Sequence, residues 1–346
     1  MARIVVATSH PPLAEGGHLV IARALVAALN EYGHQAGLVT TPQNRFGRQL
    51  SAYRATQLTD VGLTFDDRPV DQLISLRYPS YALRHPVHVT WLNHRMREYY
   101  DLWDRTVAPL STLEKLKEQV RRRLIHAVDR RLLTRLTRLF AQSQTIQARL
   151  AKSGIASEVI HPPAPQRPYA CGKYGDYLLA VSRLTPHKRL DLLVRALAQP
   201  EASGIRCVIA GEGDELANLR RLALELGVDD RVEFPGRIDE PTLVRRLAEC
   251  RAVCFTPYHE DYGLVTVEAF ASAKAVITCT DSGGPPELVE NGVDGFVCEP
   301  EPNAVAEAMR TLMDDRGRAE AMGEAARVKG ATMSWQSTVE RLVVPQ

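Results

Sequence analysis

The chain has 346 residues, 45% of them hydrophobic, and a formal net charge of +2 at pH 7. This length favours two domains, and this apolar fraction is ordinary for a globular protein with a large core. No apolar run approaches the ~18 residues of a membrane span, and Met1-Ala2-Arg3 leads directly into a strand-like run without a signal peptide, so we expect a cytoplasmic protein without a transmembrane helix.

The charge is divided unevenly along the chain. Residues 1–165 hold 22 Lys and Arg against 13 Asp and Glu, a net charge of +9, whereas residues 166–346 hold 21 against 28, a net charge of −7. Such an imbalance indicates that the first half meets an anionic partner.

Strand-like and helical segments alternate through the first half. Helical patterns cover residues 17–31 and 113–136, and short apolar runs typical of strands lie near residues 3–7, 36–40, 73–76, 87–91 and 138–142. This alternation predicts an α/β domain with a mostly parallel sheet. Gly16 and Gly17 precede the first helix, but their loop lacks the GxGxxG fingerprint, which disfavours a nicotinamide-dependent enzyme.

Residues 115–140 contain the densest group of basic side chains, on a predicted helix. Arginines stand at 121–123, 130, 131, 135 and 138, and apolar residues recur mostly every four positions at Leu116, Val120, Leu124, Val128, Leu132, Leu136 and Leu139. One interpretation is a helix with its apolar face on the core and its basic face in solvent. The other is docking on an anionic membrane or a lipid-phosphate acceptor, which implies peripheral attachment to the inner face of the cell membrane. We expect no nucleic acid partner, because no recognition module is present.

A stiff proline-rich segment, residues 162–168, separates the two halves, and a second α/β unit follows from about residue 169 to residue 330. The six cysteines all follow residue 170 and form no CxxC pair. They are typical of reduced core thiols, and we expect no zinc site.

Residues 259–270, His-Glu-Asp-Tyr-Gly-Leu-Val-Thr-Val-Glu-Ala-Phe, are the most informative segment. They follow a strand-like apolar run, so Glu260 is predicted on a loop, Gly263 at a helix start and Glu268 just over one turn into the helix. Free amides at such a start suit an anion, and a glycine admits a ligand close to the backbone. The spacing places one carboxylate at each end of a ligand whose phosphates bind there. Two glutamates in such a segment are also common as solvated surface charges.

Other strand ends of the second half carry polar or glycine-rich turns. Arg183 and Lys188 follow the run at 177–181 and suit a diphosphate. The other turns are Ala210-Gly211-Glu212-Gly213, Gly236-Arg237-Ile238 and Gly283-Gly284-Pro285-Pro286-Glu287. In open α/β sheets, ligands collect at this edge.

This ordered set, Ser182-Arg183-Leu184 with Lys188, the three glycine turns and the Glu260-x7-Glu268 pair, resembles the donor half of retaining glycosyltransferases of family 4. The resemblance is dense from about residue 177 to 300 and thinner in the first half. It implies the GT-B fold, with two Rossmann-like domains facing across a cleft. The implied acceptor-side domain is 1–165, with a C-terminal helix in 332–346 packing back on it, and the implied donor domain is 166–331.

The resemblance also implies roles for individual residues. Glu268 would accept hydrogen bonds from the ribose hydroxyls, and Glu260 would bind hydroxyls of the donor sugar. The amides of Gly263, Leu264 and Val265 would hold phosphate and sugar oxygens, and Arg237 and Ile238 would flank the base. Gly16 and Gly17 would let the substrates reach the amides of the first helix. His94 would hydrogen-bond the transferred sugar, although a lone histidine is more often structural.

One interpretation places Arg95, Arg97 and the aromatic cluster Tyr99, Tyr100 and Trp103 on the acceptor side. The aromatic cluster suits packing equally well, and for Trp103 we favour packing. Lys274 departs from the family pattern, because many relatives carry glycine at or near this position. We expect the change to affect only a helix end.

The expected reaction is transfer of a hexose from a nucleotide-sugar, UDP- or GDP-hexose, to a saccharide, polysaccharide-precursor or lipid-linked acceptor. Retention and same-face displacement are family inferences. Arg183 and Lys188 would stabilise the charge on the leaving diphosphate. We expect no metal and no other cofactor, since the sequence has no clear DxD triplet. A GT-B epimerase, a glycan phosphorylase and a nucleotide-sugar-binding or scaffold protein without turnover are the alternatives. The sequence leaves the base, the sugar, the acceptor, the linkage and the oligomeric state open.

Overall fold

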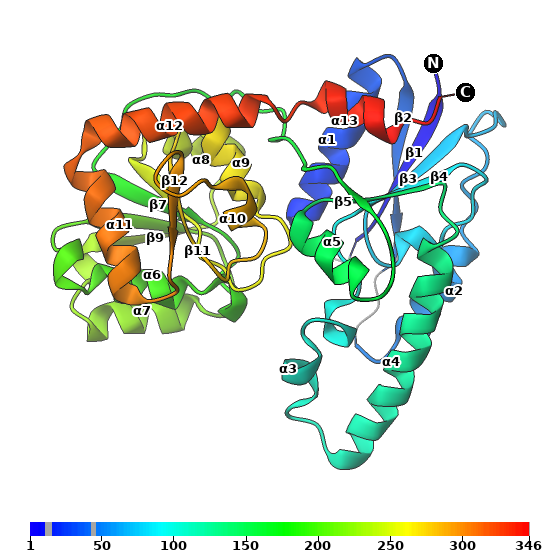
Figure 1. Cartoon of the computed structure of the whole chain (residues 1–346), viewed down its shortest axis with the longest axis horizontal. Helices are drawn as coiled ribbons and strands as arrows, with labels where there is room; N and C mark the ends of the chain where they lie inside the picture. Colours follow the sequence, from blue (N-terminus) through cyan, green and yellow to red (C-terminus); the bar gives the residue numbers. More distant parts are fainter. Residues whose placement is uncertain (11–15, 43–45, 346) are drawn as a thin grey trace. The chain divides into compact units, whose positions relative to one another are not determined.

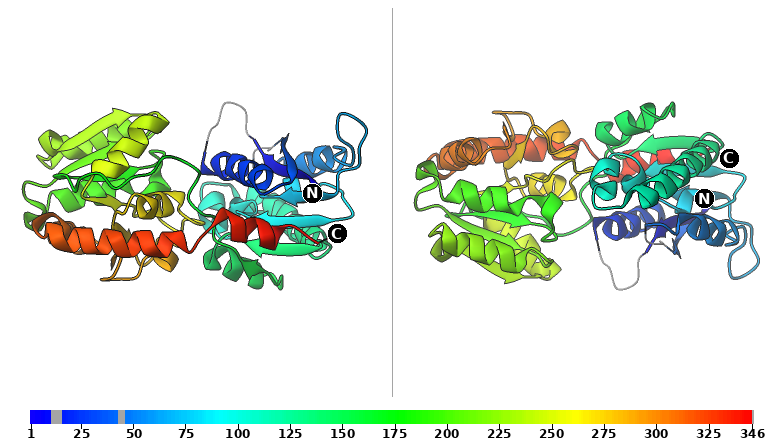
Figure 2. Two further views of the ribbon diagram at one scale, coloured as in Figure 1. Left: turned by 90° about the horizontal axis from the view of Figure 1, so that it is seen from above. Right: turned by 90° about the horizontal axis from the view of Figure 1, so that it is seen from below.

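A computed structural model describes residues 1–10, 16–42 and 46–345. The chain divides into two compact units, Met1–Pro162 with Ser334–Gln346, and Pro163–Met333 (Figure 1). The boundary lies within the proline-rich segment, three residues before the expected position. Figure 2 shows helices on both faces of the sheet in each unit.

The first unit contains, in the described part of the chain, a six-stranded sheet of order β2-β1-β3-β4-β5-β6, and every neighbouring pair is parallel. Its strands are β1 (Arg3–Ser9), β2 (Gln35–Thr41), β3 (Gln72–Ser75), β4 (His88–Leu92), β5 (Arg138–Ala141) and β6 (Glu158–Val159). Its α-helices are α1 (Gly17–Glu31), α2 (Gln49–Gln57), α3 (Trp103–Val107), α4 (Thr112–Leu133), α5 (Gln144–Ala151) and α13 (Trp335–Leu342). The sheet and the first helix confirm the predicted α/β class.

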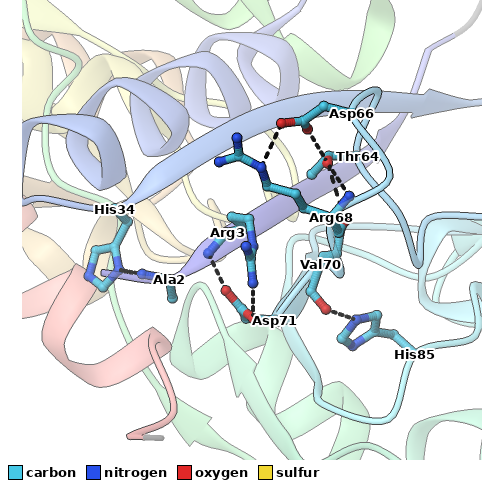
Figure 3. A network of polar contacts seen from close by, with 9 residues as sticks. All are labelled: Ala2, Arg3, His34, Thr64, Asp66, Arg68, Val70, Asp71 and His85. Carbon is cyan, nitrogen blue, oxygen red and sulfur yellow. Dashed lines mark hydrogen bonds and ion pairs between the residues drawn. The ribbon is translucent and has the colours of Figure 1, made fainter.

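An ion-pair network fixes the amino-terminal edge of this sheet (Figure 3). The guanidinium of Arg3, at the start of β1, lies 3.0 Å from a carboxylate oxygen of Asp71, which precedes β3. The second oxygen of Asp71 accepts a hydrogen bond from the Arg3 amide at 2.7 Å. Nε2 of His85 lies 3.0 Å from the carbonyl oxygen of Val70. The network therefore sets the register of β1 against β3 at the edge opposite to the carboxyl ends of the strands.

The C-terminal helix α13 belongs to the first unit. The ring of Trp335 packs edge-on against Trp91 of β4 at 6.3 Å, and the Gln72 side chain donates to the Leu342 carbonyl at 2.8 Å. Gln72 also accepts from the Val344 amide at 2.9 Å. One buried side chain of β3 thus holds both the end of the helix and the residues after it.

The second unit contains a second parallel sheet, of order β12-β11-β10-β7-β8-β9 within the described ranges. The strands are β7 (Tyr177–Val181), β8 (Arg206–Ala210), β9 (Val232–Gly236), β10 (Ala252–Cys254), β11 (Val276–Cys279) and β12 (Gly295–Cys298). The α-helices are α6 (Leu190–Leu197), α7 (Leu216–Glu225), α8 (Glu240–Glu249), α9 (Leu264–Ala271), α10 (Pro285–Leu288), α11 (Pro302–Asp314) and α12 (Arg316–Ala331).

Alternation along the strands of the second unit makes a core on each face of its sheet. Leu178 and Ala180 of β7 lie in the cluster with α6, α7 and α11, whereas Leu179 lies in the cluster with α8 and α9. Successive strand side chains point to opposite faces, so strands covered on both sides are apolar throughout. Four of the six cysteines are buried in these cores, and Cys171 is exposed.

Two predictions about the basic helix are wrong. Helix α4 ends at Leu133, so residues 134–136 lie outside it. The apolar positions in its first half face solvent, with exposed fractions of 60% for Leu116, 54% for Val120 and 51% for Leu124. Positions four apart advance about 40° around an α-helix, so a strict four-residue spacing winds away from any one face.

The buried face of α4 is half polar, because its buried residues are Glu118, Ile125, Asp129 and Leu133. The Asp129 carboxylate accepts hydrogen bonds from the hydroxyls of Tyr53, Tyr81 and Tyr100, and Glu118 accepts from Tyr99. Burial raises the pKa of Asp129, and the three hydroxyl donors oppose this rise. The tyrosine hydroxyls need buried acceptors, and these acceptors lie on the same face of the helix as the buried Ile125 and Leu133. No helix within the described ranges is long and apolar enough to span a membrane.

Replacing Trp335 with alanine is expected to destabilise the first unit by about 3 kcal/mol, because a buried aromatic ring and its contact with Trp91 are lost. Trp335 is 7% exposed. Urea unfolding followed by far-ultraviolet circular dichroism measures the change. The control is Gln336→Ala, an exposed position on the same helix, which should shift the midpoint little. Equal midpoints for both variants would show that α13 does not stabilise the unit.

Candidate functional site

The candidate site lies at the carboxyl ends of three neighbouring strands of the second unit. Strand β10 pairs with β7 on one side and with β11 on the other. Because all three run parallel, the loops that follow them leave the same edge of the sheet. These loops contain residues 182–189, 255–263 and 280–284. Of the predicted site residues, they hold Arg183, Lys188, Glu260 and Gly263.

Lys188 and Glu260 come together at this edge, as the sequence predicted for a common site. Nζ of Lys188 lies 2.5 Å from a carboxylate oxygen of Glu260, and the two side chains are 12% and 20% exposed. The ammonium also lies 5.4 Å from the centre of the Phe255 ring. An ammonium has three donors, so Lys188 can bind Glu260 and an added anion together.

The backbone of Glu260 is fixed to the loop after β11. Its amide donates to the Ser282 carbonyl at 2.8 Å, and its carbonyl accepts from the Gly284 amide at 3.0 Å. Gly283 has a φ of +83°, and a Cβ atom there would lie 2.3 Å from the carbonyl oxygen of Glu260. Only glycine allows these two loops to approach so closely. The glycine pair of the Gly-Gly-Pro-Pro-Glu motif therefore positions Glu260.

Arg189 joins all three loops, a role that the sequence analysis missed. Its guanidinium binds both oxygens of Asp281, at 2.6 and 2.7 Å, and donates to the carbonyls of Thr256 and Pro257 at 3.0 and 3.1 Å. This planar, bidentate geometry is the one that arginine provides and lysine does not. The sequence does contain the signal, an arginine after one strand and an aspartate after a nearby strand, but cations at this edge are also typical phosphate ligands.

Gly263 begins helix α9, as predicted. It has a φ of +92° and a ψ of +66°, and a Cβ atom there would lie 2.8 Å from Pro285 Cγ and 2.9 Å from Phe255 Cε1. The first amides of an α-helix have no acceptor within the helix and carry its positive dipole end. The start of α9 is therefore a place where an anionic group binds close to the backbone.

Glu268 lies on α9, one turn beyond these amides, and is only 5% exposed. Oε1 of Glu268 binds the guanidinium of Arg167 and accepts from the Tyr169 hydroxyl at 3.1 Å. Both contacts use Oε1, so Oε2 keeps its lone pairs for another donor. Burial raises the pKa of Glu268, and the positive charge of Arg167 opposes this rise. Arg167 and Tyr169 were predicted as part of a linker or beside it, and the structure places them in the second unit as partners of Glu268.

The other predicted donor residues lie on neighbouring loops. Arg183 follows β7, is exposed, and makes no hydrogen bond or ion pair through its guanidinium with any residue the structure describes. Arg237, exposed, and Ile238, half-buried, follow β9. The Gly211 amide donates to the Gly236 carbonyl at 2.8 Å, so the loops after β8 and β9 lie side by side. Leu264 and Val265 form the first turn of α9 and are half-buried.

His94, Gly16 and Gly17 belong to the first unit, and their contact with a donor stays a prediction. Nδ1 of His94 lies 2.6 Å from the Arg95 carbonyl oxygen, beyond the end of β4. Burial and the charge of Arg77 lower the pKa of His94 well below its usual range, so the ring is neutral at pH 7. Gly16 and Gly17 stand at the N-terminus of α1, and the preceding residues 11–15 lie outside the described residues.

Two of the residues that were predicted to line the acceptor side are packed inside the first unit. Arg95 is 6% exposed, donates to Ser153 Oγ at 2.9 Å and lies 3.6 Å from the Tyr100 ring centre. Tyr99 is fully buried and donates to Glu118 at 2.8 Å. Trp103 packs beside Tyr99 at 6.1 Å, which agrees with the packing role that we favoured.

Lys274, the departure from the family pattern, is fully buried beyond the end of α9. Its ammonium donates to the Lys173 carbonyl at 3.0 Å and lies 3.7 Å from the centre of the Tyr174 ring. Ala273 takes the left-handed conformation, with a φ of +52°, that ends the helix. The substitution therefore affects the packing of a helix end. In the described ranges, no three His, Cys, Asp or Glu side chains form a group suited to a metal.

Replacing Gly263 with alanine is expected to destabilise the second unit by about 2–4 kcal/mol, because a left-handed conformation and two side-chain clashes combine. The matched control is Gly292→Ala, since Gly292 has a φ of +81° and nothing within 4 Å of an added Cβ. The control should cost only about 1–2 kcal/mol. Thermal unfolding of both variants measures the difference, and equal losses would show that α9 does not need a glycine for close packing.

Comparison with known proteins finds sequence similarity mainly over the second unit. Residues 172–329 match the family model for Glycosyl transferases group 1. A GDP-mannose-dependent alpha-(1-6)-phosphatidylinositol monomannoside mannosyltransferase of Mycobacterium tuberculosis is 37% identical over 169 residues, 46% of this chain and 43% of that protein. A D-inositol 3-phosphate glycosyltransferase of Mycolicibacterium paratuberculosis is 35% identical over 175 residues, 49% of this chain and 39% of the relative. The aligned part thus spans less than half the length of these curated relatives.

Solved structures match over the whole chain. The Anabaena protein HepE, in complex with UDP and glucose, has a TM-score of 0.73 at 19% identity and covers 99% of this chain and 98% of its own. WaaG, a glycosyltransferase involved in lipopolysaccharide biosynthesis, has a TM-score of 0.69 at 17% identity and covers 99% of this chain and 100% of its own. These matches confirm the GT-B fold.

Proposed function

We propose that this protein is a retaining glycosyltransferase that moves a hexose from UDP- or GDP-hexose to a saccharide, polysaccharide-precursor or lipid-linked acceptor. The observation that carries the proposal is the Lys188–Glu260 pair, held beside the start of α9 in a group 1 domain. Two similarities support the donor class: the mycobacterial relative is GDP-mannose-dependent, and HepE was solved with UDP and glucose.

Breaking the sugar–phosphate bond places negative charge on the leaving diphosphate. Lys188, the exposed guanidinium of Arg183 and the first amides of α9 are fixed positive groups that would stabilise this charge. No metal is needed for such an arrangement. The leaving phosphate would take the proton of the acceptor hydroxyl as the new bond forms on the same face of the sugar.

Glu260 would bind hydroxyls of the donor sugar rather than attack its anomeric carbon. Its carboxylate is ion-paired with Lys188, and a paired carboxylate is a weaker nucleophile than a free one. Retaining glycosidases, by contrast, use such a carboxylate to form a covalent intermediate. In this proposal the ion pair links the sugar hydroxyls to the diphosphate through two neighbouring side chains.

Glu268 would bind the ribose through Oε2, while Arg167 and Tyr169 hold Oε1. The positive charge of Arg167 favours the ionised carboxylate and opposes the burial that raises its pKa. The loop of Arg237 and Ile238 would flank the base, so contacts with the base would come largely from the backbone.

Thermal unfolding with UDP-, GDP-, ADP-, CMP- and dTDP-sugars, without added metal, tests the donor class. A ligand present at 100 times its dissociation constant stabilises the native state by about 2.7 kcal/mol, so UDP- or GDP-hexose should raise the melting temperature. Release of the free nucleotide in the presence of EDTA then tests turnover without metal. No shift with any donor would contradict the proposal, and a shift without turnover would favour a binding protein.

Glu268→Gln is expected to weaken nucleotide binding by about 10- to 100-fold, because hydrogen bonds from the ribose hydroxyls to a charged acceptor are lost. Titration with the nucleotide and with its 2′,3′-dideoxy form separates this effect from a change of fold. The variant should lose affinity for the nucleotide but not for the dideoxy form. The control is Glu225→Gln, an exposed position on α7. An equal loss for both ligands would remove Glu268 from the ribose site.

A further inference from the structure

Helix α4 presents an apolar line to solvent, directly opposite its buried face. Leu113, Leu116, Val120 and Leu124 are 78%, 60%, 54% and 51% exposed. Their spacings of three and four residues keep them on one side of the helix over about 16 Å. We call these four residues the outer apolar line. In Figure 1, α4 extends well beyond the sheet of its own unit, so no described element of that unit covers this side.

The charged residues of α4 are also divided between its buried and its exposed face. The helix holds seven Lys and Arg and three acidic residues. Two of the acids, Glu118 and Asp129, are buried and hydrogen-bonded to tyrosines, and the third, Glu114, binds the helix N-terminus through Ser111. The exposed surface of the helix is therefore more strongly positive than its composition indicates.

A cationic pocket of about 900 Å³ continues from the end of the outer apolar line. Seven of its thirteen lining residues within the described ranges are Arg or Lys, and one, Asp101, is acidic and already paired with Arg97. Ala127 lines the pocket one turn beyond Leu124, so the apolar line leads to the pocket mouth. Among the described residues, Arg123, Arg131 and Lys152 form no ion pair. These three cations are available to an anion.

We propose that α4 docks on an anionic membrane, with the outer apolar line inserted at the interface and lipid phosphates bound in the cationic pocket. Interfacial helices combine an apolar face with flanking cations in this manner, and each basic residue near an anionic surface strengthens binding. The apolar line lies on α4 and the pocket adjoins it along the same helix, as the acyl chains and the phosphate adjoin in one lipid. This inference does not depend on the identity of the sugar donor.

The same features disfavour the other occupants of this surface. A polyanion such as nucleic acid would use the cations but would leave four leucine and valine side chains in water. A second copy of α4 would cover the apolar line but would bring two positive helices together, with repulsion between them. A lipid surface satisfies the apolar side chains and the cations together.

Flotation of the full chain with vesicles tests the proposal. Binding is expected to vesicles that contain about one third phosphatidylglycerol, and binding to phosphatidylcholine alone should be at least about 10-fold weaker. Two variants should each lose at least about 10-fold in partitioning: Leu116→Gln/Val120→Gln/Leu124→Gln, and Arg123→Gln/Arg131→Gln/Lys152→Gln. The changed side chains are exposed or line a pocket, and thermal unfolding with the donor nucleotide verifies that each variant folds. If the apolar triple variant unfolds, Val120→Asp alone replaces it.

Matched controls come from the second unit. Leu224→Gln/Val328→Gln changes two apolar residues that are 67% and 56% exposed, and Lys173→Gln/Arg195→Gln/Arg245→Gln removes three exposed cations. Both controls should bind vesicles as the unaltered chain does. Absence of binding by the unaltered chain, equal binding to both vesicle types, or a loss equal to that of the controls would overturn the proposal. A loss of binding with the Arg123→Gln/Arg131→Gln/Lys152→Gln variant alone would overturn the proposal in favour of a polyanion.

Discussion

Parallel pairing of every strand in both sheets is the constraint on which the site depends. Because β7, β10 and β11 run in the same direction, their carboxyl ends meet at one edge. Three loops far apart in the sequence therefore lie together. Without this pairing, Lys188 and Glu260 would be two charges separated by more than seventy residues and with no common role.

The loops are held at that edge by interactions that take no part in the proposed reaction. Arg189 ties the loops after β7, β10 and β11 through Asp281 and two carbonyls. Gly283 allows the Glu260 backbone to approach within hydrogen-bonding distance of its neighbours. Fixed positive groups stabilise a developing charge most when they need not reorganise during the reaction. The proposed chemistry therefore requires loops that hold the positive groups in fixed positions.

In the first unit, buried acidic residues lie on the inward face of a helix. Asp129 and Glu118 are stable inside because tyrosine hydroxyls donate to them, and with Ile125 and Leu133 they form the inward face of α4. The apolar side chains on the opposite face are then left in solvent, at a cost in free energy that an occupied surface would remove. The inward polar network and the proposed membrane surface are two consequences of one helix orientation.

The sequence alone determined the fold class, every strand of the two sheets except β6 and β12, and the position of Glu260, Gly263 and Glu268 at a strand end and helix start. These follow from local signals: apolar runs, glycine turns and spacing within a short segment. Only the tertiary structure decided which side chains pair with one another at the site. Arg167 reaches Glu268 across 101 residues and Arg189 reaches Asp281 across 92, and no local pattern encodes such contacts. It also decided which face of α4 is buried, because that choice depends in part on tyrosines from three other segments that need a hydrogen-bond acceptor.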